Sequence, residues 1–403
     1  MRRSRLPLAF VVAVAAAAVA TFLLRPRSGL IEPAPVEIQH YFTSGQLERA
    51  EDFRSLQRVL GLAGLGIGIG TLALLAWRPP RGLLRRLGTR PLPGAAAAGA
   101  GISLLLVVAE LPVRAWTRQR SLDVGLATQS WPDWAVDVLK GAGIGAVTAA
   151  IAGLVAIALI RRFPGHWWAP GALLVVAYGV VTIWLYPIVI DPLFNRFDRL
   201  PAGELRSEVL QLADRAGVDV GEVYRVDASR RTSAANAYVV GLGHTKRVVI
   251  YDNLIDDFPR DELRVVVAHE LGHQKHHDLL RGLAWLAIVA PAGTFLVQAL
   301  SERLNRRAPL GTPAALPAIA LAVSLVGLGL GCASNALSRQ VEGRADAFAL
   351  ELTRDSAGFI DFERRITVKN IADPDPPELL HLLFDTHPTT VERLGYGVAV
   401  RDK

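Results

Sequence analysis

Seven long apolar runs limit how this chain can fold. They cover approximately residues 7–24, 58–77, 94–112, 139–160, 168–190, 282–300 and 312–333. Each run is close to the ~20 residues that a helix needs to cross the hydrocarbon core of a bilayer. Since hydrophobic residues make up 51% of the 403 positions and are bunched into these runs, we expect a mainly α-helical, polytopic membrane protein with about seven transmembrane helices.

The basic residues lie mainly in short loops between these runs. Five arginines fall within residues 78–90, and others lie at the start of the chain and within 161–167 and 301–311. Loops rich in Lys and Arg stay in the cytoplasm, so this count places the N-terminus inside and the segment 191–281 outside. Membrane orientation thereby explains the net charge of +7, and we expect no nucleic-acid partner.

The composition also suggests where the protein resides. Arginine greatly outnumbers lysine, and alanine and glycine are abundant, which indicates a bacterial plasma membrane protein. The first apolar run follows a basic start but has no clean small-x-small cleavage site, so we favour a retained first helix over a cleaved signal peptide. Nothing in the sequence predicts an oligomeric state.

A short motif, His269-Glu270-Leu271-Gly272-His273, predicts the chemistry. Two histidines four residues apart on a helix project from one face, and their imidazoles can bind a single zinc ion. The glutamate between them is placed to assist the attack of a zinc-bound water. Because a five-residue pattern also occurs by chance, a solvated helix face carrying two ordinary histidines remains an alternative for the motif alone.

The polar segment around this motif is long enough for a small α+β domain. Residues 203–216 predict an amphipathic helix, and strands are expected at 222–227, 236–243 and 246–251, the last of them central in its sheet. A helix begins near Pro259, after which acidic residues suit its N-terminus, and we expect it to continue through Asp278. The motif therefore lies on a predicted helix.

A catalytic zinc site needs a third protein ligand, and the last apolar run leads directly into a candidate for it. At helical spacing, four polar residues share one face there: Asn335, Arg339, Glu342 and Asp346. Glu342 can supply the third ligand, and Asp346 can accept a hydrogen bond from a ligating histidine and fix its tautomer. The alternative is again a solvated helix face.

These motifs together resemble the M48 membrane metallopeptidases, most closely the Ste24-like branch of CAAX prenyl endopeptidases. The resemblance rests on the His-Glu-x-x-His helix, the stretch from Ser338 to Asp346, and the late Asp385-Thr386-His387-Pro388. Further matching stretches are 191–197 and 236–241. Before about residue 186, only the number of spans and the hydropathy match.

The resemblance implies an N-terminal membrane region at 1–190 and a gluzincin-like peptidase domain at 191–403 that includes the spans near 282–300 and 312–333. It implies one Zn²⁺ per chain bound by His269, His273 and Glu342, with Glu270 as general base. Asp346, Asn335 and Arg339 would support these ligands. Substrate-side roles fall on the remaining matched residues: Asn236, Ala237 and Tyr238 as a strand that pairs with an extended peptide, His387 as a group that stabilises the oxyanion, and Arg393.

The function that follows is a zinc-dependent membrane endopeptidase that cleaves membrane-associated or lipidated, CAAX-type peptides. The alternatives are an HtpX-like quality-control protease of membrane proteins, a membrane sensor that cleaves a repressor, and a non-catalytic scaffold. The resemblance also implies a site that faces the cytoplasm, against the count of basic loops. We expect His276 and His277 to be polar surface residues and Glu110 to be interfacial.

Overall fold

The computed structural model describes residues 5–241, 246–305 and 309–402, apart from the side chain of Arg81. Three of the expectations above fall partly outside these ranges. They are the basic start at residues 1–4, the end of the strand predicted up to 243, and Arg306 and Arg307 of the basic loop at 301–311.

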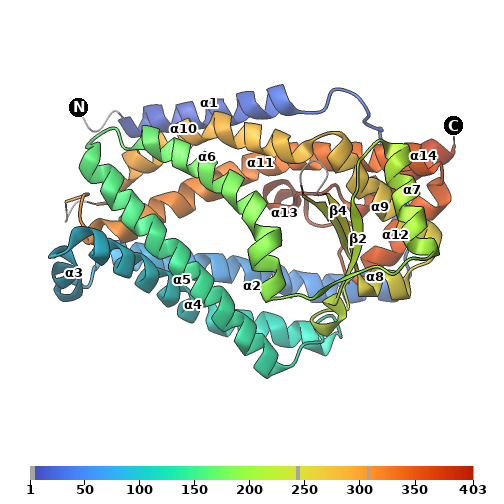
Figure 1. Ribbon diagram of the computed structural model, residues 1–403, viewed down its shortest axis with the longest axis horizontal. Helices are drawn as coiled ribbons and strands as arrows, with labels where there is room; N and C mark the ends of the chain where they lie inside the picture. Colours follow the sequence, from blue (N-terminus) through green and yellow to red (C-terminus); the bar gives the residue numbers. More distant parts are fainter. Residues whose placement is uncertain (1–4, 242–245, 306–308, 403) are drawn as a thin grey trace.

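Among the described residues, seven helices are long and apolar enough to cross a membrane, as predicted. They are α1 (Arg5–Leu24), α2 (Ser44–Trp77), α4 (Pro91–Asp123), α5 (Trp131–Arg162), α6 (Trp168–Leu185), α10 (Asp278–Leu304) and α11 (Leu316–Thr353). The short helix α3 (Arg81–Gly88) links α2 to α4, and α6 continues through a π-turn, Tyr186–Ile190, and a 3₁₀ turn, Asp191–Leu193. Figure 1 shows most of these helices side by side, with the mixed α/β part at one end.

Several helices extend well beyond the apolar runs, so the prediction of polar loops at 25–57 and 113–138 is partly wrong. A capping box at Thr43 starts α2 at Ser44, where the Thr43 hydroxyl and the Gln46 side chain bind each other's backbone N–H groups. The polar turns of α2 contact the C-terminal part of the chain, since Arg54 donates to the carbonyls of Asn370 and Ile371, each at 2.6 Å. These contacts favour helix over loop.

A four-stranded sheet lies toward one end of the helical bundle (Figure 1). Its order is β1 (Phe197–Arg199), β2 (Glu222–Val226), β4 (Arg247–Tyr251) and β3 (Ala237–Val240), with only the β2–β4 pair parallel. The expected central position of the 246–251 strand is confirmed, and β3 lies at an edge. Strand β1 was not predicted, because three residues including Asp198 and Arg199 carry no apolar alternation.

The sheet packs against the helix that carries the motif, α9 (Arg260–Lys275). Val223, Val248 and Ile250 of the sheet share a buried core with Leu263 and Leu271 of α9. The amphipathic helix α7 (Glu204–Ala216) covers α9 as well, and α8 (Asp252–Asp257) leads into it. This core fixes one face of α9 and directs the opposite face toward α11.

The motif helix ends earlier than expected. It was predicted to continue through Asp278, but α9 stops at Lys275, and His277 adopts a left-handed conformation with φ of 54° before α10 begins at Asp278. A non-glycine residue in this region is uncommon and marks a sharp change of direction. The break turns the chain so that Asp278 faces back to His273, at 3.0 Å.

The C-terminal helices close the structure around α11. They are α12 (Ser356–Lys369), α13 (Glu378–Phe384) and α14 (Thr390–Arg401). At the other end of the chain, α1 packs along α10 and α11, where Ala17 and Ala20 meet Trp285 and Val289. The first span therefore packs against the C-terminal spans, and the predicted division at residue 190 stays a prediction.

Candidate active site

Three side chains from two helices converge on one point. His269 and His273 of α9 place their Nε2 atoms 3.2 Å apart, and Glu342 of α11 lies 3.2 Å from His269 Nε2 and 3.6 Å from His273 Nε2. All three ligand atoms lie within 4.8 Å of one another. Two imidazoles and one carboxylate form a donor set that suits a divalent metal and leaves a position open for water or substrate. The residues present therefore fit a catalytic metal.

A glycine lets the two helices approach. Gly272 lies against α11, where an added Cβ would meet Phe348 at 3.1 Å and the Ala345 backbone at 3.4 Å. A larger residue would separate α9 from α11. Since Glu342 and the two histidines sit on these helices, the separation would pull the carboxylate away from the imidazoles.

Each histidine has its second ring nitrogen held by a carboxylate. Asp346, fully buried, lies 2.8 Å from His269 Nδ1, which agrees with the role predicted from its spacing. Such a contact fixes the tautomer and leaves Nε2 free for a metal. Asp346 is itself held by Arg393, whose guanidinium donates to both carboxylate oxygens at 2.9 and 2.6 Å.

The matching partner of His273 was missed from the sequence. A carboxylate oxygen of Asp278 lies 3.0 Å from His273 Nδ1, where it can accept a hydrogen bond, and its side chain is only 8% exposed. Asp278 also pairs with Arg344, and with Arg281 at 3.4 Å. Its position five residues after His273 does not suit a contact within one helix. The left-handed residue between α9 and α10 creates the contact, and only that turn could have signalled it.

Glu270 lies in α9 between the two histidines. Burial raises the pKa of its carboxyl, and the nearby His269 and His273 oppose that rise. A carboxylate whose pKa is closer to neutral accepts a proton from water more readily than an exposed one. Its place in the sequence and its surroundings both suit a general base.

Asn335 and Arg339 share the face of Glu342 but do not touch the ligand triad. Asn335 Nδ2 donates to the Leu383 carbonyl at 2.7 Å, and Arg339 donates to three carbonyls at the end of α13, the closest being Asp385 at 2.7 Å. A cation at a helix C-terminus satisfies carbonyls that lack intrahelical partners. These two residues fasten the segment that leads to His387 rather than the metal ligands.

That segment brings His387 to the site. Its Nε2 lies 3.3 Å from Glu342 Oε2, and its Nδ1 lies 2.9 Å from the Thr386 hydroxyl. Burial lowers the pKa of the His387 imidazole, and the negative charge of Glu342 partly counters this lowering. The structure therefore brings together His269, Glu270, His273, Glu342, Asp346 and His387.

Arg393 is the last of the residues expected on the substrate side. Its guanidinium contacts Asp346 and lies 2.9 Å from Glu363, with little exposure. It supports the carboxylate behind His269. A contact between Arg393 and substrate stays a prediction.

The predicted substrate strand lies next to the motif helix. Ala237 and Tyr238 belong to edge strand β3, and Asn236 precedes it. Gln274, the residue after His273, donates to the Val239 carbonyl at 3.2 Å. The Tyr238 hydroxyl donates to Asp191 at 3.0 Å, which connects β3 to the end of the fifth span.

Two other expectations concern side chains near the spans. His276 packs edge-on against Phe348 and His277 forms the left-handed turn, and neither joins the metal group found among the described residues. Glu110 pairs with Arg114 at 2.7 Å and lines a cavity of about 680 Å³ beside the glycine-rich face of α2. Glu110 therefore lines an open cavity, and its interfacial position stays a prediction.

Comparison with known proteins agrees with this geometry. The model of peptidase family M48 matches residues 199–396, and that of the CAAX prenyl protease N-terminal region, with five membrane helices, matches 90–196. An uncharacterized metalloprotease of Bacillus subtilis, YhfN, is 32% identical over 306 residues, which are 73% of this chain and 71% of that protein. This chain belongs to peptidase family M48. It is a membrane metalloendopeptidase with several spans.

Eukaryotic M48 relatives match over shorter stretches. CAAX prenyl protease 1 homolog of Arabidopsis thaliana is 33% identical over 230 residues, and CAAX prenyl protease 1 of Saccharomyces cerevisiae is 33% identical over 177. The matches cover 54% and 43% of this chain and 52% and 38% of those proteins. The crystal structure of S. mikatae Ste24p aligns with a TM-score of 0.78 at 18% identity and covers 98% of this chain and 99% of that one, which shows a shared fold.

Proposed function

We propose that this M48 protein is a zinc-dependent membrane endopeptidase that binds one Zn²⁺ per chain through His269, His273 and Glu342. The observation that carries the proposal is the convergence of these ligands together with a carboxylate on the second nitrogen of each histidine. Such outer carboxylates are typical of zinc-ligating histidines. A solvated helix face would not bury Asp346 completely against His269.

When bound, zinc would supply a Lewis acid that polarises the scissile carbonyl and makes water a better nucleophile. Glu270 takes the proton from the attacking water and then delivers it to the leaving amine. His387 donates a hydrogen bond to the oxygen that becomes negative as the carbonyl is attacked. The edge strand β3, with Asn236, Ala237 and Tyr238, holds the peptide in an extended conformation.

The substrates we propose are membrane-associated or lipidated peptides of the CAAX type. Relatives named CAAX prenyl proteases support this class, although the alignments cover about half of those proteins or less. The site also lies where α10 and α11 leave the membrane-spanning bundle (Figure 1). Quality-control cleavage of membrane proteins is the second candidate, because the same position would expose the site to misfolded spans.

The test uses the full chain purified in a mild detergent. Metal analysis is expected to find one zinc per chain, and peptides carrying an isoprenyl cysteine are expected to be cut faster than the same peptides without lipid. Removal of zinc with a chelator should abolish cleavage, and readdition should restore it. Purified chain that carries no zinc and cuts no peptide would overturn the proposal. Equal cleavage with and without lipid would favour the quality-control candidate.

We propose the bacterial plasma membrane as the location, which the composition and the Bacillus subtilis relative support. Helix α3 and the C-terminal end of α5, which carry arginines, lie at the end of the bundle away from the sheet (Figure 1). Counting basic loops therefore puts the site outside the cytoplasm, whereas the family resemblance puts it inside. A reporter that is active on only one side of the membrane, fused after Lys403, distinguishes the two orientations.

A further inference from the structure

A second cavity lies far from the metal site, at the end of the bundle where α1, α5 and α10 meet two connecting loops. Its volume is about 640 Å³, within the ~300–1,000 Å³ that small-ligand sites occupy. Its lining includes Arg5, Arg161, Trp167 and Glu302. None of these residues takes part in the proposed peptidase chemistry.

The polar groups of this cavity lack their usual partners. Among the described residues, neither Arg5 nor Arg161 forms an ion pair, and Arg161 donates only to the Gly311 carbonyl, at 3.5 Å. Trp167 also lines the cavity, but its indole N–H has almost no exposed surface, so a ligand in the cavity does not reach it. The two guanidinium groups, which have no carboxylate partner among the described residues, are therefore open to a ligand.

One carboxylate complements these donors. Glu302 accepts a hydrogen bond from Gln298 at 3.0 Å and has no cationic partner among the residues described. The cavity therefore presents two guanidinium groups for an anion, together with one carboxylate for a cation. A ligand that matches must carry both charges a short distance apart.

The wall between these groups is fixed in place. Gln298, only 2% exposed, donates to the Gly165 carbonyl at 2.8 Å and accepts from the Trp168 backbone at 3.3 Å. These bonds tie the α5–α6 loop to α10. The surface of α1 that follows Arg5 is apolar and exposed, including Leu8 and Phe10, and so suits contact with acyl chains.

We propose that this cavity binds the headgroup of an aminophospholipid, such as phosphatidylethanolamine. Arg5 and Arg161 bind the phosphate, since guanidinium groups recognise phosphate through several donors at once. Glu302 binds the primary ammonium group. The acyl chains lie along the exposed apolar surface of α1. The binding is non-covalent and independent of peptide cleavage.

The test is native mass spectrometry of the purified full chain titrated with phosphatidylethanolamine, phosphatidylglycerol or phosphatidylcholine. Phosphatidylethanolamine is expected to bind most tightly, because phosphatidylglycerol has no ammonium and the trimethylammonium of phosphatidylcholine cannot donate to Glu302. The double variant Arg5→Gln/Arg161→Gln should weaken its binding by about tenfold or more, given the strength of charge-assisted hydrogen bonds. Glu302→Gln, which still accepts from Gln298, should abolish the preference for phosphatidylethanolamine.

The matched control is Arg85→Gln/Arg86→Gln, which removes two exposed arginines from α3 at the same end of the bundle. It should leave binding unchanged, and melting temperatures of all variants show that they fold. Equal binding of the three lipids, preference for phosphatidylglycerol, or an equal loss in the control variant would overturn the proposal. Binding of inorganic phosphate as tight as that of the lipid would also overturn it, since that outcome describes a simple anion site.

Discussion

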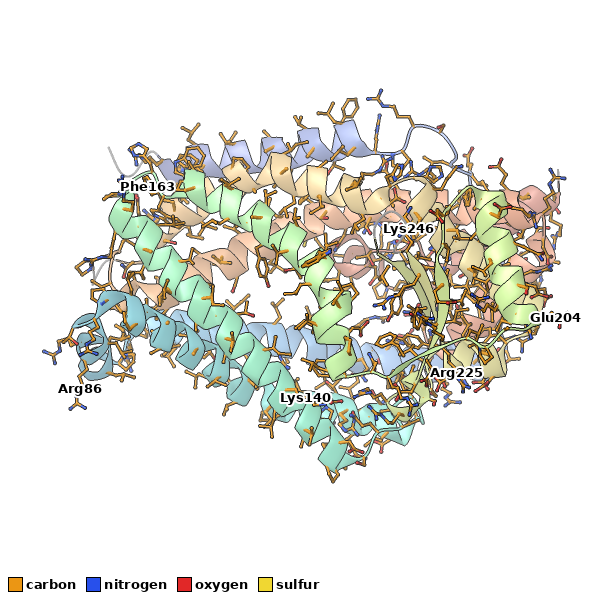
Figure 2. The ribbon with its side chains drawn as sticks, in the orientation of Figure 1. Arg86, Lys140, Phe163, Glu204, Arg225 and Lys246 are labelled. Carbon is orange, nitrogen blue, oxygen red and sulfur yellow. The ribbon has the colours of Figure 1, made fainter. Side chains whose placement is uncertain are left out.

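The spans of this protein differ sharply in how they are packed. Half of the apolar window of α10 and 44% of that of α11 is buried, against 11% for α2 and none for α6. The well-buried pair carries Asp278, Glu342 and Asp346, whereas the exposed helices carry no residue of the metal site. Figure 2 shows side chains crowded around the sheet, beside which the metal site lies, and side chains projecting outward along α5.

The difference in burial reflects the different structural requirements of the two sets of spans. Lipid-facing helices need length, apolar surface and small residues where helices cross. The helices α10 and α11 must also hold carboxylates within hydrogen-bond distance of two histidines on α9. Substitutions in the two regions should therefore differ in kind: those in α10 and α11 affect the metal, and those in α2 to α6 affect packing alone.

The largest effect is expected for Glu342→Ala. It removes one of the three proposed ligands, so bound zinc and peptidase activity should both fall to background. Glu351→Ala is the matched control, because Glu351 is an exposed acid on the same helix. Metal analysis of both purified variants is the measurement, and full zinc retention in Glu342→Ala would refute the assignment of this ligand.

Asp278→Asn should have the next largest effect. Loss of an outer carboxylate lowers metal affinity by about 10–100-fold, since the amide orients His273 less strongly. Competition with a fluorescent zinc chelator measures the change. Asp361→Asn, at an exposed position on α12, is the control. Unchanged affinity in Asp278→Asn would mean that its contact with His273 serves folding alone.

A substitution at the contact between α4 and α5 tests the role of packing in the lipid-facing spans. An added Cβ at Gly99 of α4 would lie 2.2 Å from the Ala149 carbonyl oxygen of α5, whereas at Gly101 it would meet nothing within 4 Å. Gly99→Ala should destabilise the protein by about 1–3 kcal/mol, as overpacking does, and leave zinc content unchanged. Gly101→Ala should be neutral. Loss of zinc in Gly99→Ala would break the contrast between the two sets of spans.

The smallest effect concerns pH. Burial raises the pKa of Glu363 from 4.5 to about 7, although Arg393 opposes the rise. The folded protein thus binds a proton more tightly than the unfolded chain, so this contribution to stability is full below pH 4.5 and is lost as the pH rises through 7. Glu363→Gln should reduce the loss of unfolding free energy with rising pH by on the order of 1 kcal/mol. Thermal unfolding at several pH values measures it, and an unchanged slope would contradict the account.

How much the sequence predicts depends on whether a feature is local. The spans, the motif helix and the face shared by Glu342 and Asp346 follow from spacing along single helices, and the structure contains them. Asp278 could not be predicted, because its contact needs the left-handed turn at His277. Arg339 likewise contacts carbonyls more than 40 residues away, through a helix whose position the sequence does not specify.

The most direct test of the central claim is a comparison of Glu270→Gln with wild type. The substitution removes the proposed general base but none of the three ligands. We predict that Glu270→Gln binds one zinc per chain, melts close to wild type, and cleaves a lipidated peptide at least ~100-fold more slowly, as expected for loss of general-base catalysis. A zinc-loaded Glu270→Gln variant that cleaves as fast as wild type would contradict the claim.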